Sequence, residues 1–192
     1  MKTYTKDEIA KIGNTIVFLS LRVPDLSKTK LLKLLYILEE SFVKQYYIPF
    51  LGLEFEVWQA GPVARDIFID LSDNPVLLEE YIVIEKDSDS TYIKAIKDFS
   101  DDEFSDNEIE MMEDLSSKLA QRSARDLVNF THRKGSNWYQ IAKSTGLLEK
   151  FEKKLANSSE EKIDFTWYLD PKGKETYDDQ VSFNKLVQCV NE

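Results

Sequence analysis

The sequence predicts a mainly α-helical protein of the α+β class, a compact helical bundle with a small antiparallel β-sheet or hairpin and a strand-to-helix Gly-Pro turn. Three observations predict this class. Apolar residues recur at helical spacing in several segments. Three shorter segments (residues 53–57, 81–85 and 92–96) instead read as strands. The 192 residues, 42% of them hydrophobic, can bury a core without a disulfide or a metal.

Two helices are expected at the start of the chain. A capping box, Thr5-x-x-Glu8, precedes a helical run of isoleucines and leucines. Either Asp25 or Ser27 can cap the second helix, which is apolar in nearly every direction over residues 31–43. Such a helix is expected at the centre of a bundle.

The second helix also carries charged residues. Lys28, Lys30 and Lys33 lie near its N-terminal end, where their charge opposes the helix dipole. We expect them to be solvated, with contact to an acidic surface as the alternative. Glu39 and Glu40 point to different sides of the helix and are also expected to be solvated.

A strand-to-helix turn is predicted around a Gly-Pro pair. Residues 53–57 alternate like a strand with one face on the core. Gly61 permits a sharp change of direction, and Pro62 suits the first turn of a helix because its missing N–H costs nothing there. A helix starting at Pro62 could offer free N–H groups to a carboxylate. Trp58 is expected to pack under a helix, with exposure as the alternative.

The middle of the chain predicts a hairpin followed by helices. Residues 81–85 and 92–96 form its strands, and the acidic segment 98–106 lacks the glycine and ligand spacing of a calcium loop. Later helix starts share a side chain that can cap them: Ser105 with Glu108, Ser123 with Asp126, and Ser136 or Asn137.

The tail is expected to contain a helix, a strand and a closing helix. Residues 163–169 alternate like a strand, residues 170–173 read as a turn, and apolar residues from Phe183 to Val190 fit the last helix. We therefore divide the chain into a domain of residues 1–145 and a C-terminal extension of residues 146–192 packed on it.

Composition limits the classes of ligand and the cellular location that we expect for the protein. The formal net charge of −10 repels phosphate backbones, which argues against nucleic acid as the main ligand and favours encounter with a basic partner. No run of 18 apolar residues and no N-terminal apolar segment is present, so we expect no membrane association. The single cysteine, Cys189, cannot form an internal bridge, and a cytoplasmic location is the simplest interpretation.

No catalytic pattern is evident. The chain has one histidine, His132, and no phosphate-binding or nucleophile motif, so we expect neither an enzyme nor a bound metal or cofactor. His132 lies at a predicted helix end, where it can bond the last carbonyl groups and where the dipole favours its protonated form. A carboxylate-only magnesium site among the 35 acidic residues is the enzyme alternative.

Three segments together carry a resemblance: "SKTKLLKLLYILEE" (27–40), "FEVWQAGPVARDIF" (55–68) and "SARDLVNFTHRKGSNWYQIA" (123–142). In this order they resemble the Panacea domain, also described as the SocA-like antitoxin domain, over roughly residues 7–143. The residues that match the family pattern are Lys30, Leu31, Lys33, Leu34, Tyr36, Trp58, Gly61, Pro62, Val63, Thr131, His132 and Trp138. Asn137 departs from it, because the family often has proline before the last tryptophan.

The resemblance implies an antitoxin-type module that neutralises a cognate toxin by direct binding, the toxin usually being encoded by a neighbouring gene. Aromatic and arginine side chains often dominate such interfaces. The candidates for partner binding are Trp58, Arg65, Trp167 and Tyr168.

Two alternatives remain. A nucleic-acid-linked regulator, such as an operon autorepressor, requires a basic face, which Lys28, Lys30, Lys33 and Lys44 could partly form. An enzyme with a carboxylate metal site is the third candidate.

Overall fold

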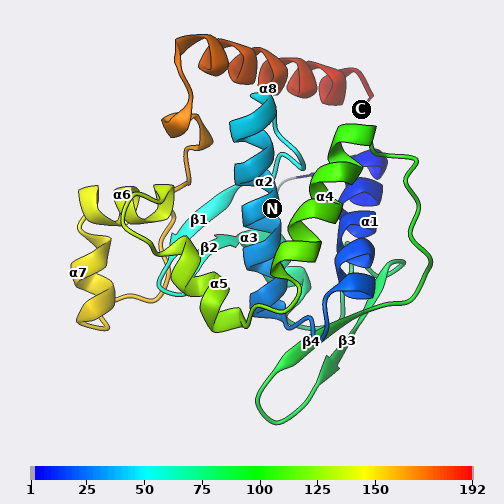
Figure 1. Ribbon diagram of the computed structural model, residues 1–192, viewed down its shortest axis with the longest axis horizontal. Helices are drawn as coiled ribbons and strands as arrows, with labels where there is room; N and C mark the ends of the chain where they lie inside the picture. Colours follow the sequence, from blue (N-terminus) through cyan, green and yellow to red (C-terminus); the bar gives the residue numbers. More distant parts are fainter. Residues whose placement is uncertain (1–2, 192) are drawn as a thin grey trace.

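A long helix, α2, runs through the centre of the molecule, and the other elements are arranged around it (Figure 1). The computed structural model describes residues 3–191, with side chains as far as residue 187, so the side chain of Val190 lies outside the described residues. In chain order the elements are α1 (Lys6–Arg22), α2 (Lys28–Tyr46), β1 (Phe55–Trp58), β2 (Gly61–Ala64), α3 (Arg65–Asp70), β3 (Ile82–Lys86), β4 (Thr91–Ala95), α4 (Asp106–Leu119), α5 (Ala124–Thr131), α6 (Asn137–Ser144), α7 (Leu147–Glu152), the 3₁₀ helix η1 (Phe165–Tyr168) and α8 (Pro171–Asn191). The predicted mainly helical class with small antiparallel sheets is confirmed.

The core surrounds α2 on all sides, as its apolar sequence predicts. Leu31, Leu35 and Tyr36 are each at most 1% exposed. Helix α4 packs on one side of α2, with α1 next to α4, and the β1–β2 hairpin and α5 pack on the other side (Figure 1). Burial in every direction explains why one helix can organise the whole chain.

Side chains cap the N-termini of the helices at the positions that the sequence predicts. Thr5 and Glu8 form the reciprocal capping box of α1, with hydrogen bonds of 2.8 and 3.2 Å. Two choices left open by the sequence are now decided. Ser27 caps α2 by accepting from the Lys30 N–H, and Ser136 caps α6 by accepting from the Tyr139 N–H.

The expected strand-to-helix turn at Pro62 is wrong. Gly61, at φ +97°, closes a hairpin in which β2 pairs with β1, and α3 begins only at Arg65. Pro62 is tolerated in β2 because it faces Val57, whose N–H points away from β2 to the Glu161 carbonyl at 2.9 Å. Pro62 therefore offers no free helix N-terminus to a carboxylate.

The second predicted hairpin is confirmed. Strands β3 and β4 pair in antiparallel register from Ile82↔Ala95 to Lys86↔Thr91. Hydrogen bonds attach the hairpin to the bundle: the Ile93 N–H donates to the Leu26 carbonyl, the Ala95 N–H donates to the Ser20 hydroxyl, and that hydroxyl donates to the Ile93 carbonyl.

The tail differs from its prediction. Residues 163–169 were expected to be a strand, but only a bridge between Glu56 and Lys162 forms, and the chain then coils into η1. Phe165 drives this change, because its ring packs against the rings of Phe55 and Tyr36, 5.8 and 5.7 Å away. A 3₁₀ turn places this single large side chain in the core.

The expected turn at residues 170–173 is instead the first turn of α8. Pro171 occupies the first helical position, and the Asp170 carboxylate accepts from the Gly173 N–H at 2.7 Å. The closing helix is thus longer than predicted. The division of the chain at residue 145 stays a prediction, although the extension contacts β1 through the Glu161 and Ile163 backbone.

Substitution of Gly13 tests the packing of α1. A methyl group at this position would overlap the Tyr81 ring. We expect Gly13→Ala to lower the free energy of unfolding by about 1–3 kcal/mol, although alanine favours a helix over glycine. Urea denaturation measures the loss. In a Tyr81→Ala background the same change should stabilise the protein, and an equal loss in both backgrounds would contradict the contact.

Candidate functional site

The three resembling segments meet beneath the β1–β2 hairpin. The Lys33 ammonium, from α2, donates to the Pro62 carbonyl of β2 at 2.7 Å. A Cβ on Gly61 would lie 2.9 Å from Lys33 Cε and 2.9 Å from Thr131 Oγ1, at the end of α5. Only glycine allows α2, β2 and α5 to approach this closely.

A second contact joins α6 to the same hairpin. The Trp138 indole N–H donates to the Trp58 carbonyl at 2.9 Å, and the Trp138 ring lies 3.9 Å from the His132 ring. Trp138 is 5% exposed. We call Lys33, Gly61, Thr131, His132 and Trp138 the hairpin cluster.

Burial controls the charges of the hairpin cluster. Lys33 is 1% exposed, and desolvation lowers its pKa to about 7. Desolvation, followed by the nearby Lys33 charge, lowers the pKa of His132 to about 4. The buried Nε2 atom of His132 has no hydrogen-bond partner among the described residues. The expectation of a protonated, dipole-stabilised His132 is therefore wrong, because its environment favours neutral imidazole.

A carboxylate on α2 connects the tail to the core. Glu40 accepts from the Tyr36 hydroxyl at 3.1 Å and pairs with Lys44 at 3.2 Å and with Arg133 at 3.8 Å. The Lys44 ammonium also lies 3.7 Å from the ring centroid of Tyr168. Tyr168, a predicted partner-binding residue, is half-buried in this arrangement.

The neighbouring Glu39 has a structural role. It is 1% exposed and accepts from the backbone N–H groups of Phe50, Leu51 and Gly52 at 3.1, 2.8 and 3.3 Å. Burial still raises its pKa to about 7, since desolvation outweighs these bonds. The prediction that Glu39 and Glu40 are solvated is wrong.

The lysines do not form the basic face that the nucleic-acid alternative requires. Lys33 is buried, and Lys30 is 7% exposed, its ammonium donating to the carbonyls of Pro24 and Ala120 at 3.1 and 2.8 Å. Lys44 is engaged by Glu40, so of the four expected lysines only Lys28 lines a groove. The expectation of solvated lysines at the start of α2 fails for Lys30 and Lys33.

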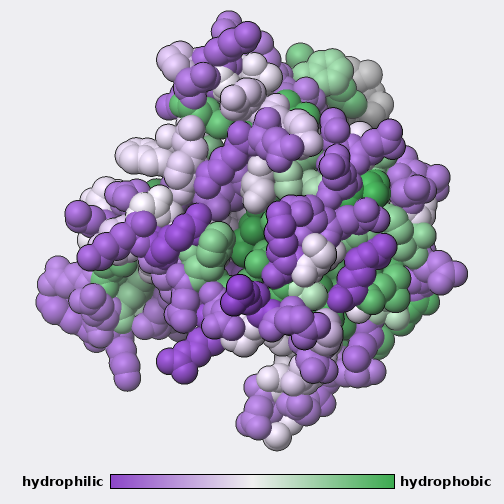
Figure 2. All heavy atoms as spheres, viewed as in Figure 1, coloured by the Kyte–Doolittle hydropathy of each residue, from purple (hydrophilic) through white to green (hydrophobic). Residues whose placement is uncertain are grey.

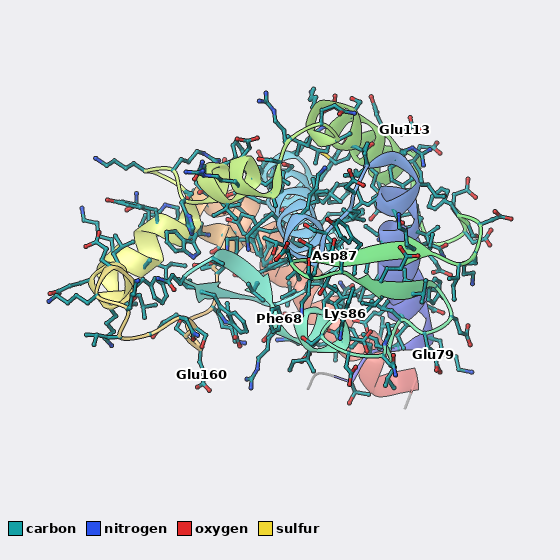
Figure 3. All side chains as sticks on the ribbon, turned by 90° about the horizontal axis from the view of Figure 1, so that it is seen from below. Phe68, Glu79, Lys86, Asp87, Glu113 and Glu160 are labelled. Atoms are coloured by element: carbon teal, nitrogen blue, oxygen red, sulfur yellow. The ribbon has the colours of Figure 1, made fainter. Side chains whose placement is uncertain are left out.

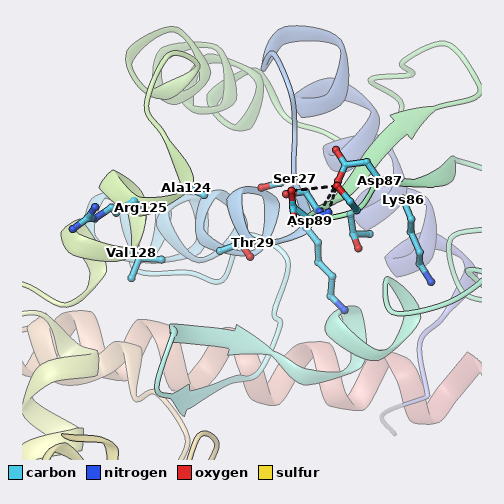
Figure 4. A pocket seen from close by; sticks show the side chains of 12 residues that line it. Ser27, Thr29, Lys86, Asp87, Asp89, Ala124, Arg125 and Val128 are labelled. Atoms are coloured by element: carbon cyan, nitrogen blue, oxygen red, sulfur yellow. Dashed lines mark hydrogen bonds between the residues drawn. The ribbon is translucent and has the colours of Figure 1, made fainter.

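That groove lies where the N-terminal ends of α2 and α5 approach the β3–β4 loop (Figure 4). Its volume is about 680 Å³, and both Arg125 and the acidic pair Asp87 and Asp89 line it. The Asp87 carboxylate closes the loop by accepting from the backbone N–H of Asp89 at 2.8 Å. Both cations and carboxylates thus line the groove, which gives it no single charge preference.

Lys28, which lines this groove, also contacts an aromatic side chain on the underside of the molecule. Phe68 of α3 and Lys86 of β3 lie on neighbouring parts of that side (Figure 3). The Lys28 ammonium lies 3.6 Å from the Phe68 ring centroid. Desolvation and the Lys86 charge lower the pKa of Lys28 to about 8. The Phe68 ring also packs edge-on against Trp58, 4.9 Å away.

Trp58 is half-buried, between the two alternatives left by the sequence. Its indole N–H donates to the Glu56 carboxylate at 2.9 Å, and Lys162 pairs with the same group at 2.9 Å.

Arg65 is exposed and lines, with Glu56 and Lys162, a hollow of about 170 Å³. Trp167 is 59% exposed on η1. Sequence reasoning missed Glu56, because strand alternation gives no sign that the tail covers it.

The described residues hold no group of three or more His, Cys, Asp or Glu side chains placed to bind a metal ion. Within the same part of the chain, no helix is both long and apolar enough to cross a membrane.

Replacing Lys33 should change the pH dependence of stability. Between pH 7 and 10.5 the unfolded state binds a proton that the folded state has lost, so the Lys33 contribution rises with pH by about 1.4 kcal/mol per unit. We expect this contribution to vanish in Lys33→Met, as measured by urea denaturation from pH 7 to 9. Lys118→Met, which removes an exposed lysine, should keep the wild-type slope. Equal slopes in the wild type and Lys33→Met would refute the depressed pKa.

The His132 environment can be measured directly. His132 is the only histidine of the chain, so its imidazole NMR signal is unambiguous. We expect this signal to titrate near pH 4 and to be absent in His132→Phe, which keeps a ring against Trp138. The stability supplied by the neutral imidazole should then be present above pH 6.5 and lost as the pH falls through 4. A titration at pH 6.5 or above would show that the imidazole is solvated.

Comparison with known families matches the part of the chain that contains the hairpin cluster. The family model described as "Antitoxin SocA-like, Panacea domain" matches residues 31–139, more than half of the chain, which confirms the resemblance. Curated proteins and solved structures gave no significant match. The chain therefore belongs to the SocA-like antitoxin family with a Panacea domain.

Proposed function

We propose that the protein neutralises a cognate toxin by binding it directly, without catalysis. Family membership supports a role in a toxin–antitoxin system. The observation that carries the proposal is the burial of the family residues. Lys33, Thr131 and Trp138 direct their polar atoms into the fold, so these residues build a scaffold and leave partner recognition to the surface.

The charge of that surface favours a basic toxin. The chain carries a net charge of −10, and Glu79, Glu113 and Glu160 point outward at separate places on its periphery (Figure 3). A partner with basic residues would be steered toward such a surface, and association would slow as salt screens the charges. The toxin would be the product of a neighbouring gene, and both proteins would act in the cytoplasm.

Among the predicted partner-binding residues, Trp167 is the most available. Its side chain is 59% exposed, whereas Trp58 is packed against Phe68 and Tyr168 against Lys44. An exposed tryptophan contributes a large rigid area to an interface. Arg65 is also exposed and can add charge-assisted hydrogen bonds.

Co-expression with the product of the neighbouring reading frame tests the proposal. We expect that product to stop growth when expressed alone, and the wild-type protein to restore growth and to co-purify with it. Trp167→Ala should bind about tenfold more weakly while remaining folded. Leu155→Ala, at an apolar residue 73% exposed, is the matched control and should bind like the wild type.

Two results would contradict this function. The first is a neighbouring product that is harmless when expressed alone. The second is growth arrest of equal strength with and without the protein. Normal binding by Trp167→Ala would remove only that residue from the interface.

A further inference from the structure

Helix α8 has two halves with different surroundings. In its first half Gly173 is buried against Tyr47, whose ring atom Cδ1 would lie 2.9 Å from a Cβ at this position. Tyr177 and Val181 are half-buried further along. From Ser182 to Val187, by contrast, every side chain is exposed. Among the α8 side chains that the structure describes, as far as residue 187, those packed on the bundle therefore belong to the first half.

The exposed segment from Ser182 to Val187 carries three large apolar side chains. Phe183, Leu186 and Val187 are 60%, 66% and 42% exposed. Hydrophobic side chains are visible over this end of α8, at the top of the space-filling view (Figure 2). The spacing i, i+3, i+4 places the three on one face of the helix. We call these three residues the α8 stripe.

The α8 stripe does not point toward the protein's own bundle. Tyr177 and Val181, four residues apart, mark the packed face of α8. Leu186 follows Val181 by five residues, which is a rotation of roughly 140° around the helix. Phe183 and Leu186 lie roughly 120° and 180° from Tyr177 around the helix, on a separate face, whereas Val187 lies at the border of the packed face, roughly 80° from Tyr177. Further docking of α8 in its present orientation would therefore leave Phe183 and Leu186 uncovered.

Charge indicates what covers this face. The line of the α8 stripe continues toward the N-terminus of α8 through Asp179 and Glu175, each four residues from the next, and both are exposed. Exposed Lys172 lies three residues before Glu175 on the same side, so two carboxylates outnumber one ammonium group there. A second copy of the chain would bring another net charge of −10 against these carboxylates. A partner with basic residues beside an apolar groove fits both parts of the face.

We propose that the α8 stripe inserts into an apolar groove of the toxin, with lysine or arginine residues on the rim of that groove facing Asp179 and Glu175. This inference rests on the proposed function. Insertion of an amphipathic helix into a groove commonly uses apolar side chains at i, i+3 and i+4. The stripe lies outside residues 31–139, so it can differ between proteins that share the same scaffold.

The test uses the full-length protein and the toxic product of the neighbouring reading frame, with affinity measured by titration calorimetry. The double variant Phe183→Ala, Leu186→Ala should bind at least about 100-fold more weakly, because two interface anchors are lost. Leu155→Ala is the control and should change the affinity less than about twofold. All variants should keep the wild-type melting temperature, since the substituted side chains are exposed.

Reversing the charges of Glu175 and Asp179 tests the acidic end of the same face. We expect Glu175→Lys with Asp179→Lys to slow association about tenfold and to reduce its dependence on salt. A rate equal to that of the wild type would overturn the proposed basic rim.

The outcomes separate the two proposals. Neutralisation and wild-type affinity in the double stripe variant would overturn the role of the α8 stripe and leave the proposed function intact. Absence of binding by the wild-type protein would overturn both. Sedimentation of the protein alone covers the remaining case: a dimer that dissociates in the stripe variant, with unchanged toxin affinity, would make the stripe a self-association surface.

Discussion

The bond from the Lys33 ammonium to the Pro62 carbonyl is the constraint on which the packing of α2, the β1–β2 hairpin and α5 depends. A lysine that is 1% exposed is costly to bury, and here its nearest hydrogen-bond acceptor is a neutral carbonyl. The arrangement requires the hairpin to lie directly on α2. That approach in turn requires glycine at position 61 and brings the Thr131 hydroxyl into the same contact. One buried side chain thus explains why residues from three separate segments are needed together.

Features that depend on neighbours in the sequence could be predicted, and features that depend on distant segments could not. The capping boxes at Thr5 and Ser123 form within one helical turn, and both are present. Pro62 was misassigned because its place in a strand depends on the Val57 N–H bonding to Glu161, about a hundred positions later in the chain. Glu39 was misassigned for a similar reason, since the loop at residues 50–52 returns to cover it.

The same distinction applies to the candidate site. The resemblance identified the positions of Lys33, His132 and Trp138, but a sequence pattern does not say whether a polar residue faces solvent or the core. Helix-end position suggested a charged His132, whereas its burial beside Lys33 favours the neutral form. Trp58 lies between the alternatives, because its ring is partly covered by Phe68 while its N–H is bound by Glu56.

Buried and exposed residues carry different constraints, and this difference suits a protein that must recognise a particular partner. A change at Gly61 or Trp138 disturbs several packed elements at once, so the scaffold tolerates little variation there. Phe183 and Leu186 contact no such network, and substituting an exposed side chain costs folding little. Partner recognition placed on α8 can therefore change without loss of the fold, whereas recognition placed on the hairpin cluster could not. This physical separation is the reason to look for specificity outside the residues that define the family.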